Sequence, residues 1–377
     1  MISRRAKSIQ PSATLSISSK AKELARQGKP VINMGVGEPD FVTPRHIIDA
    51  AVKALNEGKT FYTPARGIPE LVSAIVDWAK RERGIDVKDE NVIVTPGAKY
   101  AIFEAIMATV EENDEVILLD PSWVSYEPCV QMVSGKVVWV PHSEGFEDAP
   151  LEDYVSSKTK MIIINSPSNP LGVVYPKNFL KKVRDIAVDH DVLVLSDEIY
   201  DKIVFEGEFV SPVSFDDMQE RTIMINGFSK TYAMTGWRLG FAIASEEITK
   251  HMLRIQSHSV SHPTSFVQYA GVAALKGSQK CVEEMVAEFR VRRDMLMRGL
   301  DEIGLRYAPP KGAFYMFVDV GRDSMEFCKE LLEREYVAAT PGSAFGKAFN
   351  TWIRLSYATS RQNIEEAIRR LARFIEA

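Results

Sequence analysis

The sequence predicts an α/β protein with a large domain built on a mainly parallel seven-stranded sheet and a smaller α+β domain. Its 377 residues exceed the roughly 100–200 residues of a typical domain, which indicates two domains. Between residues 91 and 244, short β-branched runs alternate with longer amphipathic stretches. This alternation is typical of strands and helices around a parallel sheet. Both ends of the chain show a different, mixed pattern.

Seven short apolar runs are the predicted strands of the large sheet. They are residues 92–95, 115–119, 137–140, 161–165, 192–196, 222–225 and 239–244. Amphipathic stretches such as 99–110 and 177–189 are the predicted helices between them. Outside this region we expect helices at 16–27, 281–303, 324–334 and 361–375, and extended segments at 31–34, 313–320 and 352–357.

The two ends of the chain are predicted to join in the smaller domain. The long charged helix 281–303 would bridge the two domains. We assign residues 1–43 as an N-terminal segment that joins the small domain, residues 44–285 to the large domain and residues 286–377 to the small domain. A cleft between two domains is a common position for a ligand site.

Composition excludes several classes of function. The net charge is −5, so no global excess of basic residues favours nucleic acid or an anionic membrane. Cys129, Cys281 and Cys328 are far apart, which fits a reducing compartment and no disulfide framework. His258 and His262 are followed by Pro263 without a carboxylate between them, so a metal site is not expected. With no apolar stretch near the ~20 residues of a membrane span and no signal-like start, we expect a cytoplasmic protein.

One lysine is a candidate for a reactive amine. The segment Asn226–Phe241, which begins Asn-Gly-Phe-Ser-Lys, puts Lys230 just after the predicted strand 222–225. A short turn of small residues aims such an amine into a cleft, where partial desolvation lowers its pKa and favours a Schiff base. Ser229 and Arg238 would hold an anionic group beside it. An ordinary surface lysine is the alternative interpretation.

Other polar groups follow neighbouring strands, at the sheet edge where ligands of parallel sheets bind. Gly97, Ala98 and Lys99 open a helix after the strand 92–95 and form a candidate phosphate site. Asn169 follows the strand 161–165, and Asp197 and Tyr200 follow the strand 192–196.

Each of these groups also has a purely structural interpretation. Gly97 and Asn169 suit turns, Asp197 suits a helix N-cap, and Tyr200 suits a half-buried packing position. Their coincidence with Lys230 at one edge favours a phosphorylated aromatic aldehyde as the ligand. Such a ligand needs an imine-forming amine, an acid for a pyridine nitrogen, donors for a phenolate oxygen and a phosphate clamp.

Ordered segments along nearly the whole chain carry a family resemblance. They are residues 33–41, 62–67, 95–99, 120–123, 165–172, 196–200, 226–241 and 353–358, together with Pro11–Thr14. In this order the segments resemble the class I pyridoxal-phosphate aminotransferases of fold type I, and most closely the bacterial aspartate aminotransferase branch. The resemblance implies pyridoxal 5′-phosphate as the cofactor.

The resemblance also implies a role for each matching residue. Lys230 would form the aldimine with the cofactor and shuttle the proton, and Asp197 would pair with the pyridinium nitrogen. Tyr200 and Asn169 would bind the ring oxygen, and Trp123 would stack on the ring. The residues that would hold the phosphate are Gly97, Ala98, Lys99, Ser229 and Arg238, with Tyr62 reaching in from the neighbouring subunit of a homodimer. The bond between Asn169 and Pro170 would be cis.

On the substrate side, the resemblance implies that Arg354 binds the α-carboxylate as a bidentate fork. Gly35 would let the backbone close over the substrate, next to Trp123 and Asn169. The region 256–261 contains no arginine for a distal carboxylate, and in the similar branch a lysine at the position of Lys99 binds that group. Lys99 is otherwise a solvated lysine that opposes its helix dipole; Thr14 would assist it. A further departure is Gly227, where many members carry a serine.

The implied reaction is transamination between L-aspartate or L-glutamate and 2-oxoglutarate or oxaloacetate. The sequence leaves open an alanine, aromatic or kynurenine aminotransferase, or a C–S β-lyase, on the same scaffold. A regulatory module is disfavoured because every chemical residue is present, and a dehydrogenase because no Gly-x-Gly-x-x-Gly follows the first strand.

Overall fold

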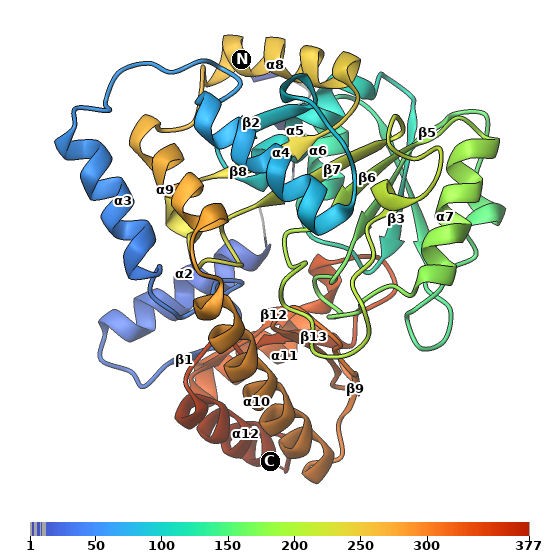
Figure 1. The fold of residues 1–377 in the computed structure, drawn as a ribbon. Helices are drawn as coiled ribbons and strands as arrows, with labels where there is room; N and C mark the ends of the chain where they lie inside the picture. Colours follow the sequence, from blue (N-terminus) through green and yellow to red (C-terminus); the bar gives the residue numbers. More distant parts are fainter. Residues whose placement is uncertain (1, 4–5, 8, 10–12, 377) are drawn as a thin grey trace.

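The computed structural model describes residues 2–3, 6–7, 9 and 13–376. It contains a seven-stranded sheet, a four-stranded sheet and a two-stranded pair. Figure 1 shows the large sheet in the upper part of the molecule and the small sheet, with the C-terminal helices, below it. Among the described residues no helix is long and apolar enough to cross a membrane.

The large sheet confirms the prediction of a mainly parallel, seven-stranded α/β architecture. Its strand order is β2-β8-β7-β6-β5-β3-β4. The strands are β2 (Val92–Thr95), β3 (Glu115–Asp120), β4 (Lys136–Pro141), β5 (Thr159–Asn165), β6 (Leu193–Asp197), β7 (Thr222–Gly227) and β8 (Gly240–Ile243). Only β8 runs antiparallel to its neighbours, β2 and β7. The strands from β4 to β7 are parallel, so their carboxyl ends share one edge.

Helices cover both faces of this sheet. Successive side chains of a strand point to opposite faces, so Ile163 packs with one set of helices and Ile162 with another. The first set is α5 (Ala98–Thr109), α6 (Tyr126–Met132) and α8 (Glu246–Ser259). On the other face lie α4 (Pro69–Arg83), α7 (Lys177–Asp189) and α9 (Ser265–Lys276), and α3 (Arg45–Asn56) packs on α9. Burial on both faces explains why the strands read as continuous apolar runs.

The small sheet is antiparallel, in the order β12-β13-β10-β9. Its strands are β9 (Arg306–Ala308), β10 (Tyr315–Asp319), β12 (Thr340–Pro341) and β13 (Trp352–Ser356). The helices of this part are α10 (Lys280–Glu302), α11 (Ser324–Glu335) and α12 (Arg361–Glu376). Helix α10 is the long amphipathic helix expected at 281–303.

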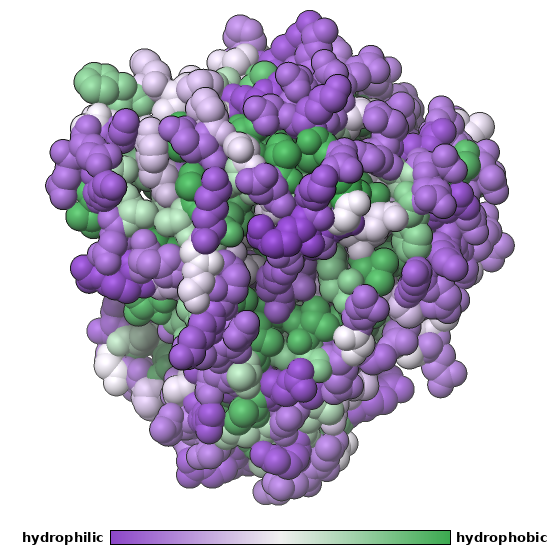
Figure 2. Space-filling view, in the orientation of Figure 1, coloured by the Kyte–Doolittle hydropathy of each residue, from purple (hydrophilic) through white to green (hydrophobic). Residues whose placement is uncertain are grey.

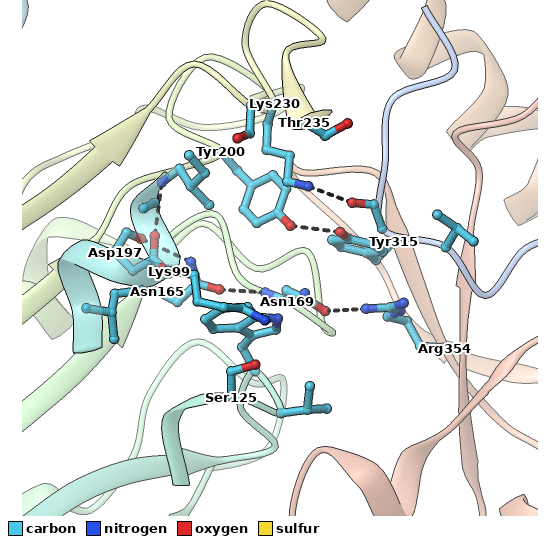
Figure 3. Close-up of a pocket in the computed structure, with 18 of the residues that line it drawn as sticks. Lys99, Ser125, Asn165, Asn169, Asp197, Tyr200, Lys230, Thr235, Tyr315 and Arg354 are labelled. Carbon is cyan, nitrogen blue, oxygen red and sulfur yellow. Dashed lines mark hydrogen bonds between the residues drawn. The ribbon is translucent and has the colours of Figure 1, made fainter. Parts of the chain in front are cut away.

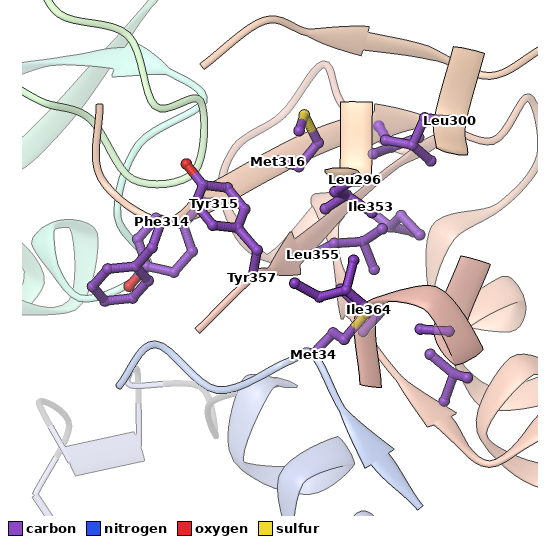
Figure 4. Close-up of a cluster of buried hydrophobic side chains, with 14 of the residues drawn as sticks. Met34, Leu296, Leu300, Phe314, Tyr315, Met316, Ile353, Leu355, Tyr357 and Ile364 are labelled. Carbon is purple, nitrogen blue, oxygen red and sulfur yellow. The ribbon is translucent and has the colours of Figure 1, made fainter. Parts of the chain in front are cut away.

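The N-terminal segment packs on this C-terminal part. Strand β1 (Ile32–Asn33) pairs in parallel with β11 (Val337–Ala338), and α2 (Ala13–Arg26) contacts β12 and α11. Figure 4 shows Met34 beside Ile364 and Leu355, within a buried apolar cluster that also includes Leu296. The domain boundaries at 43/44 and 285/286 stay a prediction.

The surface is consistent with this distribution of apolar side chains. On the face drawn in Figure 2, hydrophilic residues predominate and apolar residues gather in a few groups between them. Polar surface of this kind follows from placing the apolar faces of strands and helices in the interior.

Candidate functional site

A cavity of about 540 Å³ lies between the large sheet, the N-terminal segment and the small sheet. Most of the predicted site residues line it. They are Gly35, Ala98, Lys99, Trp123, Asn169, Asp197, Tyr200, Ser229, Lys230, Arg238 and Arg354. Residues more than 300 positions apart in the chain therefore meet in one cavity, which Figure 3 shows in detail.

The ends of β5 and β6 are joined by hydrogen bonds on the edge of the cavity. Asn165, the last residue of β5, donates from its amide nitrogen to the carbonyl oxygen of Asp197 at 3.0 Å. Its side-chain oxygen accepts the backbone N–H of Asn169 at 2.8 Å. The Asn169–Pro170 bond is cis, as expected, and the Ser166–Pro167 and Asp120–Pro121 bonds are cis as well.

Lys230 extends from the turn after β7 into the cavity. Its Nζ atom donates a hydrogen bond of 2.6 Å to the carbonyl oxygen of Gly37. Burial lowers the pKa of Lys230 to about 8, with a contribution from the positive charges of Arg354 and Arg238 that Glu38 opposes. The amine is therefore a better nucleophile near neutral pH than an ordinary lysine.

Asp197 is a buried acid at the end of β6. Burial raises its pKa to about 6, although two hydrogen bonds favour the charged form. Tyr126 donates one from its hydroxyl at 2.6 Å, and the backbone N–H of Ile199 donates the other at 3.3 Å. The sequence analysis missed Tyr126, the first residue of α6. Its ring lies edge to face with that of Trp123 at 5.2 Å.

Tyr200 meets a second tyrosine that the sequence analysis also missed. The hydroxyl groups of Tyr200 and Tyr315 are 2.7 Å apart. Tyr315 lies on β10 of the small sheet, so this contact joins the two sheets across the cavity. Its only sequence signal was its place in the predicted strand 313–320.

Arg354 is a buried cation without a carboxylate partner among the described residues. Its side chain donates to Asn169 Oδ1 at 2.9 Å and to the Gly35 carbonyl at 2.7 Å, and it lies over the Tyr315 ring at 4.5 Å. Burial lowers the pKa of this guanidinium, and its Nε atom has no acceptor within the described part of the chain. A buried charge without a counter-ion is costly, so the position suits an anionic ligand.

The start of α5 and the turn before β8 form the candidate phosphate site. Helix α5 begins at Ala98 without a side-chain cap, and Gly97 before it has a φ of +88°. A Cβ atom on Gly97 would lie 2.5 Å from Arg238 Nη2, so this glycine gives the guanidinium room. Ser229 and Thr235 line the cavity with Arg238. Thr235 was missed by the sequence analysis, although it lies three residues before Arg238 in the segment singled out there.

Lys99 and Trp123 lie next to each other in the cavity lining. Lys99 Nζ lies 4.9 Å from the centroid of the Trp123 ring. Burial is the main cause that lowers the pKa of Lys99, and Arg238 contributes. Besides Lys230, Arg238 and Arg354, Lys99 is therefore a further cation in the cavity lining.

Two predicted residues of the described part of the chain, Gly97 and Tyr62, lie outside the lining of this cavity. Gly97 lies at the start of α5, directly before the lining residue Ala98. The Tyr62 side chain is 91% exposed and lies edge-on to His262 at 5.6 Å. The Thr14 side chain lies outside the described residues. Across the described part of the chain, no three His, Cys, Asp or Glu side chains are grouped to hold a metal ion.

Together these groups fit a phosphorylated pyridine aldehyde. The chain offers an amine of lowered pKa at Lys230, a buried acid at Asp197 and a helix start beside Arg238 for a dianion. Few other ligand classes would use all three.

Comparison with known proteins gives one consistent result. The family model described as aminotransferase class I and II matches residues 29–371. An aspartate aminotransferase of Bacillus subtilis is 45% identical over 100% of this chain and 99% of its own length. A probable aspartate aminotransferase of Methanocaldococcus jannaschii is also 45% identical, with 98% of each chain covered. The solved structure of an aspartate aminotransferase from Thermus thermophilus with maleate has a TM-score of 0.96 and 42% identity, and 99% of each chain is covered.

The lowered pKa of Lys230 predicts how its reactivity depends on pH. With a pKa of about 8, roughly a tenth of the amines are neutral at pH 7, against roughly one in a few thousand for an ordinary lysine. Competitive acetylation of the cofactor-free protein, read by mass spectrometry, should therefore give half-maximal labelling of Lys230 near pH 8. Lys177, an exposed lysine at the start of α7, is an internal reference. A midpoint for Lys230 above pH 10 would contradict the burial of its amine.

Proposed function

We propose that this chain, which belongs to the class I and II aminotransferases, exchanges the amino group between L-aspartate or L-glutamate and the oxo acids 2-oxoglutarate and oxaloacetate. It is a pyridoxal-phosphate-dependent enzyme. The observation that carries the proposed reaction is the joint presence of Lys230, Asp197 and the unpaired Arg354 in one cavity. They supply an amine, a ring-binding acid and a carboxylate-binding fork.

Each residue has one task in the proposed reaction. Pyridoxal phosphate, when bound, supplies an aldehyde carbon and an electron-withdrawing ring. Asp197 would hold the proton on the ring nitrogen, and Tyr200 and Asn169 would bind the ring oxygen. Gly97, Ala98, Lys99, Ser229 and Arg238 would hold the phosphate, and Trp123 would cover one face of the ring. Lys230 would bind the cofactor and move a proton to and from the substrate Cα.

Two cations of the cavity would fix the substrate. Arg354, with its Nε atom still free, binds the α-carboxylate, and the backbone at Gly35 closes over it. Lys99, held over Trp123, binds the distal carboxylate of a dicarboxylic substrate. Thr14 is proposed to assist Lys99. This second contact is what would separate an aspartate enzyme from an alanine, aromatic or kynurenine aminotransferase, or from a C–S β-lyase.

The proposed active unit is a cytoplasmic homodimer. Tyr62 is almost fully exposed, with Phe61 beside it at 82% exposure. Adjacent exposed aromatic side chains are typical of an interface. In the dimer, Tyr62 would reach the phosphate of the neighbouring subunit.

Substitution of Lys230 should abolish catalysis and leave the protein folded. The Lys230→Ala protein is expected to lose turnover by at least about 10⁴-fold, because the group that binds the cofactor and moves the proton is gone. Borohydride reduction of the loaded protein should label Lys230 in the parent chain and no residue in the variant. An active Lys230→Ala protein with an unchanged cofactor spectrum would refute the assignment.

Lys99→Ala tests the choice of substrate. Its kcat/KM should fall roughly 10-fold to 100-fold for aspartate and glutamate, the scale of one lost charge-assisted hydrogen bond, and change little for alanine or phenylalanine. Arg354→Lys is the matched comparison, because it should weaken every amino acid through the shared α-carboxylate. Unchanged kinetics for aspartate and glutamate in Lys99→Ala would refute this specificity and favour one of the alternative activities.

A further inference from the structure

A buried ionic network lies behind the segment that carries Asp197 and Tyr200. Arg83, the last residue of α4, donates from Nε to Glu198 at 2.8 Å and from Nη2 to Asp201 at 2.5 Å. The three side chains are 4%, 1% and 2% exposed. One guanidinium thus binds the carboxylates of Glu198 and Asp201. These two residues directly follow Asp197 and Tyr200 in the sequence.

The arginine is itself fixed in place. Its Cζ atom lies 4.5 Å from the centroid of a Trp78 ring and 4.7 Å from that of Phe209. Its Nη1 atom donates to the carbonyl of Glu82 at 3.2 Å. A planar guanidinium between two aromatic rings, with both edges hydrogen-bonded, has little freedom to move.

The segment 197–203 is a compact turn held by its own hydrogen bonds. The N–H of Asp201 donates to the Glu198 carbonyl at 3.0 Å, and that of Ile203 donates to the Tyr200 carbonyl at 2.8 Å. Ser196 also donates to Glu198 at 2.9 Å. The side chains at 197 and 200 line the cavity, whereas those at 198 and 201 bind Arg83.

We propose that Arg83 is a positioning residue for the cofactor ring: its fork across Glu198 and Asp201 sets where the carboxylate of Asp197 and the hydroxyl of Tyr200 lie. This inference rests on the proposed function. Two properties of arginine are required. Its fork reaches both carboxylates at once, which a lysine cannot do, and its charge offsets Glu198 next to the buried Asp197. A buried pair that loses one partner leaves an uncompensated charge.

Arg83→Lys tests the inference because it keeps the charge and removes the fork. In the loaded protein we expect the pyridoxal-phosphate dissociation constant to rise roughly tenfold, the scale seen when an outer contact of a bound group is lost. The spectroscopic pKa of the linkage between Lys230 and the cofactor should rise by about one unit, because Tyr200 and Asp197 no longer meet the ring correctly. The kcat for aspartate should fall while KM, which depends on Arg354, stays within about twofold.

Arg293→Lys is the matched control. Arg293 on α10 is buried to a similar degree, with 7% of its side chain exposed, and binds Glu206 at 2.7 Å. This variant should lose comparable thermal stability but keep the parent linkage pKa and cofactor affinity. Asp201→Asn, which removes one carboxylate and keeps Arg83, should shift the linkage pKa in the same direction as Arg83→Lys.

The outcomes of these experiments distinguish a failure of the positioning role of Arg83 from a failure of the proposed function. A parent protein that forms no spectroscopic linkage with pyridoxal phosphate would refute the proposed function itself. A normal parent with an unshifted linkage pKa in Arg83→Lys would refute the positioning role alone. Failure of both Arg83→Lys and Asp201→Asn to fold would also overturn it, since the network would then support the whole chain rather than this turn.

Discussion

The parallel pairing of β5, β6 and β7 is the constraint on which the site depends. Asn165 pairs with Asp197, and Asp197 pairs with Ile225, two residues before the end of β7, so the carboxyl ends of the three strands lie close together across the sheet. The turns that follow them carry Asn169, Tyr200 and Lys230. A shift of one strand by one residue would turn its side chains to the opposite face. The strand register that buries the apolar core therefore also determines which polar side chains lie together at the edge of the sheet.

The charged residues form two separate groups with opposite net charge. In the cavity, four cations outnumber the acid Asp197, and this excess suits a phosphate and a carboxylate; the cations are Lys99, Lys230, Arg238 and Arg354. Behind the strand ends, Arg83 is outnumbered by Glu198 and Asp201. Burial raises the pKa of Glu198, and Arg83 is the main group that opposes this. The two networks are joined through the backbone of residues 197–201, which links the packing behind the large sheet to the cavity.

Local sequence patterns were enough to predict most of the fold and most residues of the candidate cofactor site. The predicted strand 92–95 and helix 177–189 have the observed bounds, because each is delimited by its own apolar run and turn residues. Gly97, Asn169, Asp197 and Lys230 could be placed because each follows a strand. Tyr126, Tyr315 and the network of Arg83 could not, because their contacts depend on how helices and the second sheet pack on the first. No local period encodes a meeting of Arg83 with Glu198, 115 residues later.

A crystal structure of the protein with pyridoxal phosphate and a four-carbon dicarboxylate inhibitor would test the central claim most directly. We predict density continuous from Lys230 Nζ to the cofactor, a carboxylate of Asp197 within hydrogen-bond distance of the ring nitrogen, and the two inhibitor carboxylates on Arg354 and Lys99. Cofactor density joined to another lysine, or a ring nitrogen that faces away from Asp197, would contradict the account.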